Sequence, residues 1–480
     1  MCWLFVPTIF PAFTQGYEIK ISFQGRNDTV ILGHYFAKPD MLIPNDTVVL
    51  DRAGKGVFKG GSTLDRGVYF LINDRKKLFD IMIGDEQKFE ISLDTTDLIN
   101  KTKFKSSVEN EVFFDFQRMN IQKGVRLHEL RQEYEAAAGD KKKELLRQMQ
   151  QLNRDRLAYI RQLADGNPGT FVRKFLQALI PADSDLPDYP RDADGKITDS
   201  TYVYRWYRAH FFDRFDIYDP DMLRTPLYEE KVMEYMTKVI HQHPDSVCAE
   251  ADKILAKTRA NDEMFRCVLV LLFNHYLKSE VIIHENVWVH LADKWYIPYA
   301  SWSSADYIEK LKKEVKDRTP SLIGKQAPPL EMLMALPPDH FRAAALDTAI
   351  KFDLHAGVNI KDFRQSLKSK YTAILFWDIG CAHCRKTIQE LFEAYDSLKE
   401  KGLTVITVQV VNTKDAKGKW IDFVNEHQLF GWTNAWSPYS VKYRTLYNVS
   451  TFPYIFLLNE KEEIIGKRLV PEQLKMFVGK

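Results

Sequence analysis

The feature that most constrains this chain is a pair of cysteines, Cys381 and Cys384, placed between an apolar run and an amphipathic one. The apolar run, Tyr371–Trp377, predicts a buried strand. Residues 384–401 carry apolar side chains at helical spacing and are followed by Gly402, which predicts a helix and its end. The cysteines therefore open a helix directly after a strand.

That position gives the two cysteines different chemistry. Unpaired backbone N–H groups and the helix dipole at a helix start stabilise a thiolate, so Cys381 is the expected nucleophile toward a substrate disulfide. Cys384 lies one turn inside the helix, where it is shielded and can resolve the mixed disulfide. His383 adds positive charge, which favours the Cys381 thiolate and makes the pair more oxidising. The pattern predicts a redox-active pair.

Two other interpretations of the cysteine pair are open. A C-x-x-C can be half of a zinc site, but no second C-x-x-C follows, and His355 and His427 stand singly in the sequence. The pair could also form a structural disulfide without a redox role. Its position at the start of a helix after an apolar strand favours the redox interpretation over both.

The chain has 480 residues, a length that predicts two to four domains. Residues 16–115 contain short β-rich runs separated by Gly, Asp and Asn turns, which predicts an antiparallel β-sandwich. Residues 116–320 read as an all-α region, beginning with a charged helical hairpin that breaks at Gly139. Residues 321–480 alternate strands and helices and end in a hairpin, as in a mixed α/β sheet.

Residues 202–218 are dense in aromatic and arginine side chains. One interpretation is a surface that binds a protein or peptide, because Tyr, Trp and Arg concentrate binding energy. The other is helix packing, with arginines reaching outward to solvent. We favour packing, since aromatic side chains usually lie in a core.

Residues 1–15 are expected to be a secretory signal peptide, because the start of the chain is apolar and uncharged. A basic segment is missing before it, so the native start could be truncated, and whether Cys2 is lipidated stays open. We therefore expect an exported protein of the periplasm or cell envelope. The net charge of +2 predicts no nucleic-acid partner, and no later run is apolar enough to span a bilayer.

Cys248 and Cys267 fall on predicted apolar helix faces. We interpret them as inert buried thiols. A structural bridge between the two is the alternative in an oxidising compartment.

Three motifs in the last third of the chain resemble the membrane-associated thioredoxin family of TlpA and ResA type. They are Gly-Lys-Gln-Ala-Pro-Pro from Gly324, Phe-Trp ending at Trp377 before the C-x-x-C, and Phe-Pro at Pro453. The resemblance implies a thioredoxin fold for residues 321–480. It also implies that Pro453 is a cis proline packed against Cys381, and that Trp377 belongs to the active-site strand. The upstream regions resemble two uncharacterised domains that precede such thioredoxins in envelope proteins of Bacteroidetes.

The chain also departs from the thioredoxin pattern. Leu375 stands where thioredoxins carry a buried aspartate, and Gly380 replaces a common tryptophan. The usual proton acceptor for Cys384 is therefore absent. Asp378 and Glu390 are conceivable substitutes, although we interpret both as solvated residues.

The function that follows is a thiol–disulfide oxidoreductase, more in keeping with a reductase of protein disulfides than with an oxidant. It would need an upstream thiol electron donor and no cofactor or metal beyond the Cys381–Cys384 pair. Membrane association is allowed but not required. The alternative is an envelope binding or scaffold protein whose first two regions hold a partner or glycan beside a redox-inactive platform. A peroxide-reducing relative is disfavoured, because the residues from Asp378 to Cys381 lack the threonine of that pattern.

Overall fold

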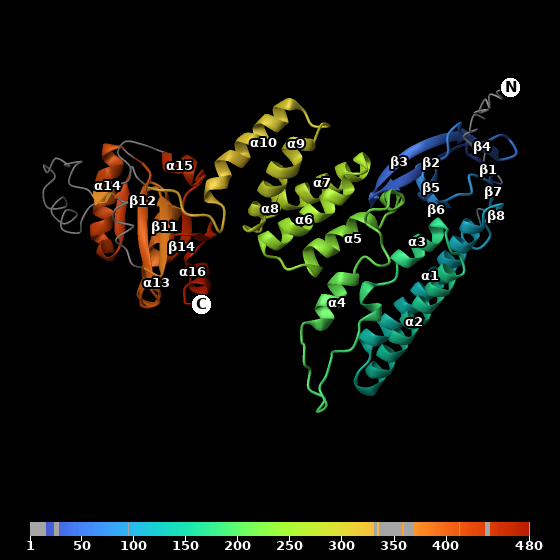
Figure 1. The fold of residues 1–480 in the computed structure, drawn as a ribbon, viewed down its shortest axis with the longest axis horizontal. Coiled ribbons are helices and arrows are strands. Elements are labelled where there is room, and N and C mark those ends of the chain that lie inside the picture. Colours follow the sequence, from blue (N-terminus) through green and yellow to red (C-terminus); the bar gives the residue numbers. More distant parts are fainter. Residues whose placement is uncertain are drawn as a thin grey trace, which may run out of the picture. The chain divides into compact units, whose positions relative to one another are not determined.

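The computed structural model describes residues 16–23, 28–94, 96–330, 334–335, 358–359, 369–411, 413–436 and 442–479 (Figure 1). The expected signal peptide, Cys2 and His355 lie outside these residues. The chain divides into two compact units, Met1–Gln242 with Glu250–Val268, and His243–Ala249 with Leu269–Lys480. Each unit therefore takes part of the helical region. The limits expected at residues 116 and 321 remain predictions.

The first unit begins with two four-stranded sheets. One has the order β4 (Lys55–Lys59), β1 (Glu18–Phe23), β7 (Lys88–Leu93) and β8 (Lys103–Lys105). The other has the order β3 (Lys38–Val49), β2 (Thr29–Phe36), β5 (Gly67–Asn73) and β6 (Lys76–Ile83). The predicted β region is confirmed, with one difference, since β1 and β7 run parallel.

Helices α1 (Val108–Ala136) and α2 (Gly139–Asp165) form the predicted hairpin (Figure 1). Gly139 opens α2 with a φ of 59°, a left-handed conformation that favours glycine. The short helix α3 (Phe171–Ala178) follows, and Thr170 caps it by accepting the amide of Arg173 at 3.2 Å.

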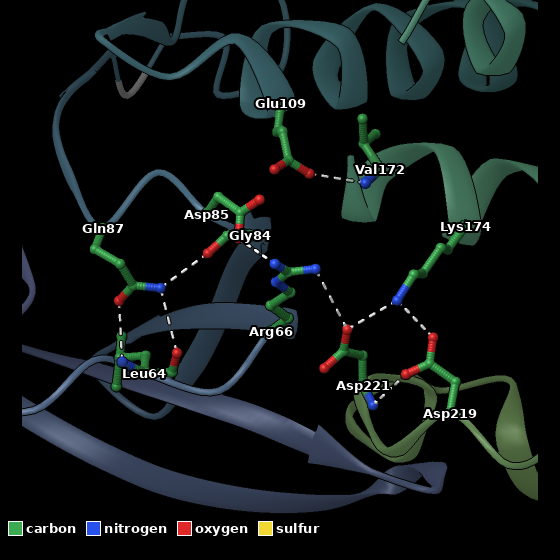
Figure 2. Close-up of polar contacts among 10 residues, drawn as sticks. All are labelled: Leu64, Arg66, Gly84, Asp85, Gln87, Glu109, Val172, Lys174, Asp219 and Asp221. Atoms are coloured by element: carbon green, nitrogen blue, oxygen red, sulfur yellow. Dashed lines mark hydrogen bonds and ion pairs between the residues drawn. The ribbon is translucent and has the colours of Figure 1, made fainter. Parts of the chain in front are cut away.

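Carboxylates hold these helices to the turn between β6 and β7. Glu86 accepts the amide of Val108 at 3.0 Å and so caps α1 from outside the helix. Glu109, in the first turn of α1, accepts the amide of Val172 at 2.8 Å (Figure 2). Gly84 makes this approach possible, because a Cβ there would lie 2.0 Å from Oε1 of Glu109. The sheets and α1–α3 are consequently packed as one body.

Lysine and arginine side chains continue this polar network (Figure 2). Lys174 of α3 donates to Asp219 at 2.6 Å and to Asp221 at 3.0 Å. Arg66 lies 3.8 Å from Asp221 and pairs with Asp85 in the β6–β7 turn. The network thereby links the sheets to the 3-10 helix η2 (Pro220–Arg224) as well.

The aromatic segment at residues 202–218 is divided between surface and core. Its second half is buried through Phe211, Phe215 and Ile217, as the packing interpretation predicted. Helix α4 (Tyr202–His210) buries no side chain, and Tyr204 is 45% exposed. Packing therefore accounts for only part of this segment.

The remaining helices run to residue 321. They are α5 (Tyr228–Glu234), the π-helix η3 (Tyr235–Val239), α6 (Pro244–Thr258), α7 (Asp262–Leu277), α8 (His284–Leu291), the π-helix η4 (Ala292–Tyr296), α9 (Ile297–Tyr299), α10 (Ala305–Arg318) and the 3-10 helix η5 (Thr319–Ser321). No helix in the described ranges combines the length and apolarity needed to cross a bilayer.

The second unit contains a seven-stranded mixed sheet, in the order β10 (Val358–Asn359), β9 (Met334–Ala335), β13 (Thr433–Trp436), β12 (Leu403–Gln409), β11 (Tyr371–Trp377), β14 (Tyr454–Asn459) and β15 (Ile464–Lys467). Strand β11 pairs parallel with β12 and antiparallel with β14. Helices α13 (Ala382–Glu400), α14 (Lys414–Glu426) and α16 (Pro471–Phe477) contribute to the core on one face, and α15 (Lys442–Leu446) contributes to the core on the other. The predicted mixed α/β architecture is confirmed.

Three buried charges fasten α8 and α10 to this sheet. Lys467 of β15 is 2% exposed, donates to the carbonyl of Ser321 at 3.0 Å and pairs with Glu285 of α8. Arg318 of α10 donates to the same carboxylate at 2.7 Å. Burial alone would raise the pKa of Glu285, but Lys467 and Arg318 hold it below its usual value.

Candidate active site

Strand β11 and helix α13 place the two cysteines where the sequence predicted them. Every residue of β11 is buried, and the chain leaves the strand at Trp377. Cys381 is the N-cap of α13, with extended backbone angles (φ −83°, ψ 114°). Its side chain stands at the end of the helix where four backbone N–H groups lack intrahelical partners.

The two thiols differ in exposure and are joined by one hydrogen bond. The amide of Cys384 donates to Sγ of Cys381 at 3.2 Å. Cys381 is half-buried, whereas Cys384 is fully buried, and both are free thiols. Burial raises the pKa of Cys384 to about 12. The neighbouring Cys381 and the carboxylate charge of Asp378 act in the same direction, whereas a hydrogen bond from the backbone of Asp378 acts against it. An incoming disulfide can therefore reach Cys381 first.

The loop before Cys381 is held by Asp378. Its carboxylate accepts the amide of Gly380 at 2.8 Å, and its carbonyl accepts the amide of Cys381 at 3.1 Å. Arg385 donates to the carbonyl of Ile379 at 2.7 Å from within α13. Asp378 thus shapes the active-site loop through an exposed hydrogen bond, and its half-buried side chain keeps contact with solvent, as we expected. Glu390 is exposed and lies 3.6 Å from Lys386, as a solvated residue would.

The position of the missing aspartate is filled by an apolar side chain. Leu375 is fully buried in the core cluster that includes Cys384 and Ile388. At this position of β11 there is consequently no carboxylate that could accept the proton of Cys384.

The other predicted site residues occupy three different environments. His383 is exposed on the first turn of α13. Trp377 is fully buried, with its ring 5.4 Å from that of Phe423, so its side chain supports the strand end from the core. Pro453 is half-buried, and the bond that joins it to Phe452 is cis, the conformation that the resemblance implied. Its packing against Cys381 and its role stay predictions.

A buried glutamine beside Trp377 was not predicted. Gln409 ends β12, in register with Trp377 on β11, and is 2% exposed. Neither its amide nitrogen nor its amide oxygen has a hydrogen-bond partner among the described residues. Such unpaired buried groups are uncommon. A polar residue at the end of the apolar run 403–411 was the one signal available.

Cys248 and Cys267 lie in the helical region and are only partly buried. No disulfide joins the two, so the alternative bridge is not formed. Burial raises the pKa of Cys267 to about 12, which is the direction expected of an inert thiol, and the inertness of both cysteines stays a prediction. Within the described ranges, no three His, Cys, Asp or Glu side chains gather as metal ligands.

Residues 369–464 match the family model described as thioredoxin-like. The C-terminal region is a thioredoxin-like domain. Residues 192–319 match a second model, described as a domain of unknown function (DUF5106). The resemblance to thioredoxins noted in the sequence is confirmed by the first match. The second falls within the predicted helical region.

Three similar proteins cover different shares of this chain. The sporulation thiol-disulfide oxidoreductase A of Bacillus subtilis is 30% identical over 111 residues, which cover 22% of this chain and 66% of that protein. The matched region is thus just under two thirds of the relative's length. A thioredoxin-like protein from Bacteroides caccae is 15% identical with a TM-score of 0.39, covering 61% of this chain and 99% of that one. The thioredoxin domain of a thiol-disulfide oxidoreductase from Bacteroides vulgatus is 24% identical with a TM-score of 0.24, covering 32% and 97%.

Proposed function

We propose that this protein is a thiol–disulfide oxidoreductase of the cell envelope that reduces disulfides in other proteins through Cys381 and Cys384. The observation that carries the proposal is the asymmetry of the pair. Cys381 is reachable at the N-terminus of α13, and Cys384 is buried one turn inside, with its amide 3.2 Å from Sγ of Cys381.

In the first step, the Cys381 thiolate attacks one sulfur of the substrate disulfide. A Cys381–substrate disulfide forms, the substrate S–S bond breaks, and the departing thiolate takes a proton from solvent. The amide of Cys384 donates to Sγ of Cys381 at 3.2 Å and so orients the attacking sulfur at the start of the helix.

In the second step, Cys384 attacks Sγ of Cys381 and releases the second substrate thiol, which carries away the proton of Cys384. The substrate has gained two electrons and two protons, and the protein holds a Cys381–Cys384 disulfide. The first step helps the second. The charge of Cys381 raises the pKa of Cys384, and this effect is lost once Cys381 is bound in a mixed disulfide, so Cys384 loses its proton more easily. An upstream dithiol must then return two electrons to the pair.

The preference for reduction rests on the TlpA and ResA resemblance, and His383 argues in the opposite direction. The reduction potential of the pair distinguishes the two. The protein would be equilibrated in graded thiol/disulfide buffers, alkylated and weighed. A potential near roughly −270 mV supports a reductase, and one near roughly −120 to −180 mV would assign disulfide formation or isomerisation instead. A pair that never cycles would refute the oxidoreductase proposal.

A further inference from the structure

The first unit contains an open hollow of about 680 Å³, which lies far along the sequence from the cysteines. It is lined by Ile99 and Asn100 from the segment between β7 and β8, by residues of α1, and by Tyr159 of α2. Its volume falls in the range of sites that bind small molecules.

One side of the hollow is fixed by an arginine. Arg118 of α1 donates to the carbonyl of Ile99 at 3.3 Å and to the carboxylate of Asp115 at 2.5 Å. The first bond joins the loop to the helix, and the second cancels the charge of the two side chains that line the hollow. The site is thus preformed and carries no net charge from this pair.

Several polar groups of the lining have no hydrogen-bond partner among the residues that the structure describes. The Gln122 amide and the Tyr159 hydroxyl make no hydrogen bond to any described residue. Asn100 uses its amide nitrogen to bond Asp97 at 2.8 Å, which leaves its oxygen available as an acceptor. Apolar side chains also line the hollow, among them Ile121, which is 51% exposed.

We propose that this hollow binds an uncharged, polyhydroxylated ligand, namely a segment of a neutral oligosaccharide. A pyranose ring has C–H groups on its faces and hydroxyls around its edge. The ring of Tyr159 and the side chain of Ile121 can pack against such a face. The planar amides of Gln122 and Asn100 and the Asp115–Arg118 pair offer donors and acceptors to adjacent hydroxyls. A charged ligand would gain no ion pair in the hollow, because the acidic and basic side chains of its lining already pair with each other.

The test is isothermal titration calorimetry of the full chain with maltohexaose, cellohexaose, xylohexaose and chitohexaose, one at a time. We expect saturable binding of at least one of them. Tyr159→Ala should weaken that binding about tenfold, and Gln122→Ala should weaken it by a smaller factor. Tyr159→Phe, which keeps the ring, should retain more affinity than Tyr159→Ala. A circular-dichroism melt of each variant verifies that it is folded.

Matched controls come from the same hairpin. Tyr134→Ala and Gln151→Ala change a tyrosine and a glutamine of α1 and α2 outside the hollow, and both should bind as the parent does. Binding that is equal in Tyr159→Ala and Tyr134→Ala would overturn the proposal. So would the absence of binding by all four sugars, or a preference for polygalacturonate that disappears with added salt. Insulin reduction by Tyr159→Ala should be unchanged. The sugar-binding proposal can therefore be rejected without rejecting the proposed redox function, and the reverse also holds.

Discussion

The cysteine pair of the thioredoxin-like domain and the hollow of the first unit are two sites built in different ways. The cysteine site comes from consecutive residues, and Cys381 and Cys384 are positioned by one strand end and the first turn of one helix. The hollow is assembled from a loop and two helices at residues 99–100, 115–122 and 159. A site made from one segment leaves a motif in the sequence, and a site made from three segments leaves none.

The largest effect should come from removing the attacking sulfur. Cys381→Ser should lower insulin-disulfide reduction by roughly a thousandfold, because a serine hydroxyl is not ionised at neutral pH and cannot form the mixed disulfide. Cys267→Ser, at a thiol that we expect to be inert, should reduce insulin at the parent rate. Activity retained by Cys381→Ser would show that another thiol attacks. Sugar binding at the hollow should be the same in both variants, which tests whether the two sites are independent.

The next largest effect should come from the buried charges behind the thioredoxin-like sheet. Glu285→Gln leaves Lys467 buried without its counter-ion and should lower the free energy of unfolding by about 3 kcal/mol. Urea denaturation followed by tryptophan fluorescence measures the loss. Glu309→Gln breaks the exposed pair with Lys312 and should cost at most about 1 kcal/mol. Equal losses in the two variants would mean that burial does not strengthen this interaction.

The same carboxylate predicts a dependence on pH. Because the pKa of Glu285 is lowered in the folded protein, its contribution to stability is present above the unfolded value of about 4.3 and is lost as pH falls through the folded value. The difference in unfolding free energy between the parent and Glu285→Gln should therefore shrink as the buffer is acidified below about pH 4. A difference that stays constant on acidification would assign the effect to packing.

A comparable loss should come from Gly84→Ala in the first unit. Its Cβ would lie 2.0 Å from Oε1 of Glu109, so the bond between Glu109 and the start of α3 must shift, at a cost of about 1–3 kcal/mol. Gly61→Ala is the matched control, because a Cβ there meets nothing within 4 Å. A thermal melt of both variants compares them directly. Equal melting temperatures for Gly84→Ala and Gly61→Ala would show that the contact between the turn and Glu109 does not contribute to stability.

The smallest effect should come from Asp378→Asn beside the cysteines. Removing the carboxylate charge takes away one of the influences that raise the pKa of Cys384, so this pKa should fall. The rate of Cys384 alkylation against pH, resolved by mass spectrometry, measures the change. Glu390→Gln, which changes an exposed carboxylate on the same helix, should leave the profile in place. A profile that is identical in Asp378→Asn and the parent would show that Asp378 acts on the loop alone.

Local pattern was sufficient to predict the structure around the two cysteines. The apolar run of β11, the apolar face of α13 and the cysteines between them depend on neighbours along the chain, so the strand, the helix and the exposed and buried roles of Cys381 and Cys384 could be predicted. The pattern was less informative where packing decides. The hydrogen bonds by which Asp378 holds the loop were not predicted, and the aromatic segment at 202–218 is only half in the core.

The sequence by itself determined the kinds of structure, namely a β region, a helical region and a mixed α/β sheet with a cysteine pair at the start of a helix, because alternation and spacing are local properties of the chain. Only the tertiary structure decided what meets across the chain. Examples are the parallel pairing of β1 with β7, Glu109 at the start of α3, Gln409 beside Trp377, and Lys467 with Glu285. These contacts join residues far apart in sequence. Their energy depends on burial and on the geometry of the partners, and neither can be predicted from a single stretch of residues.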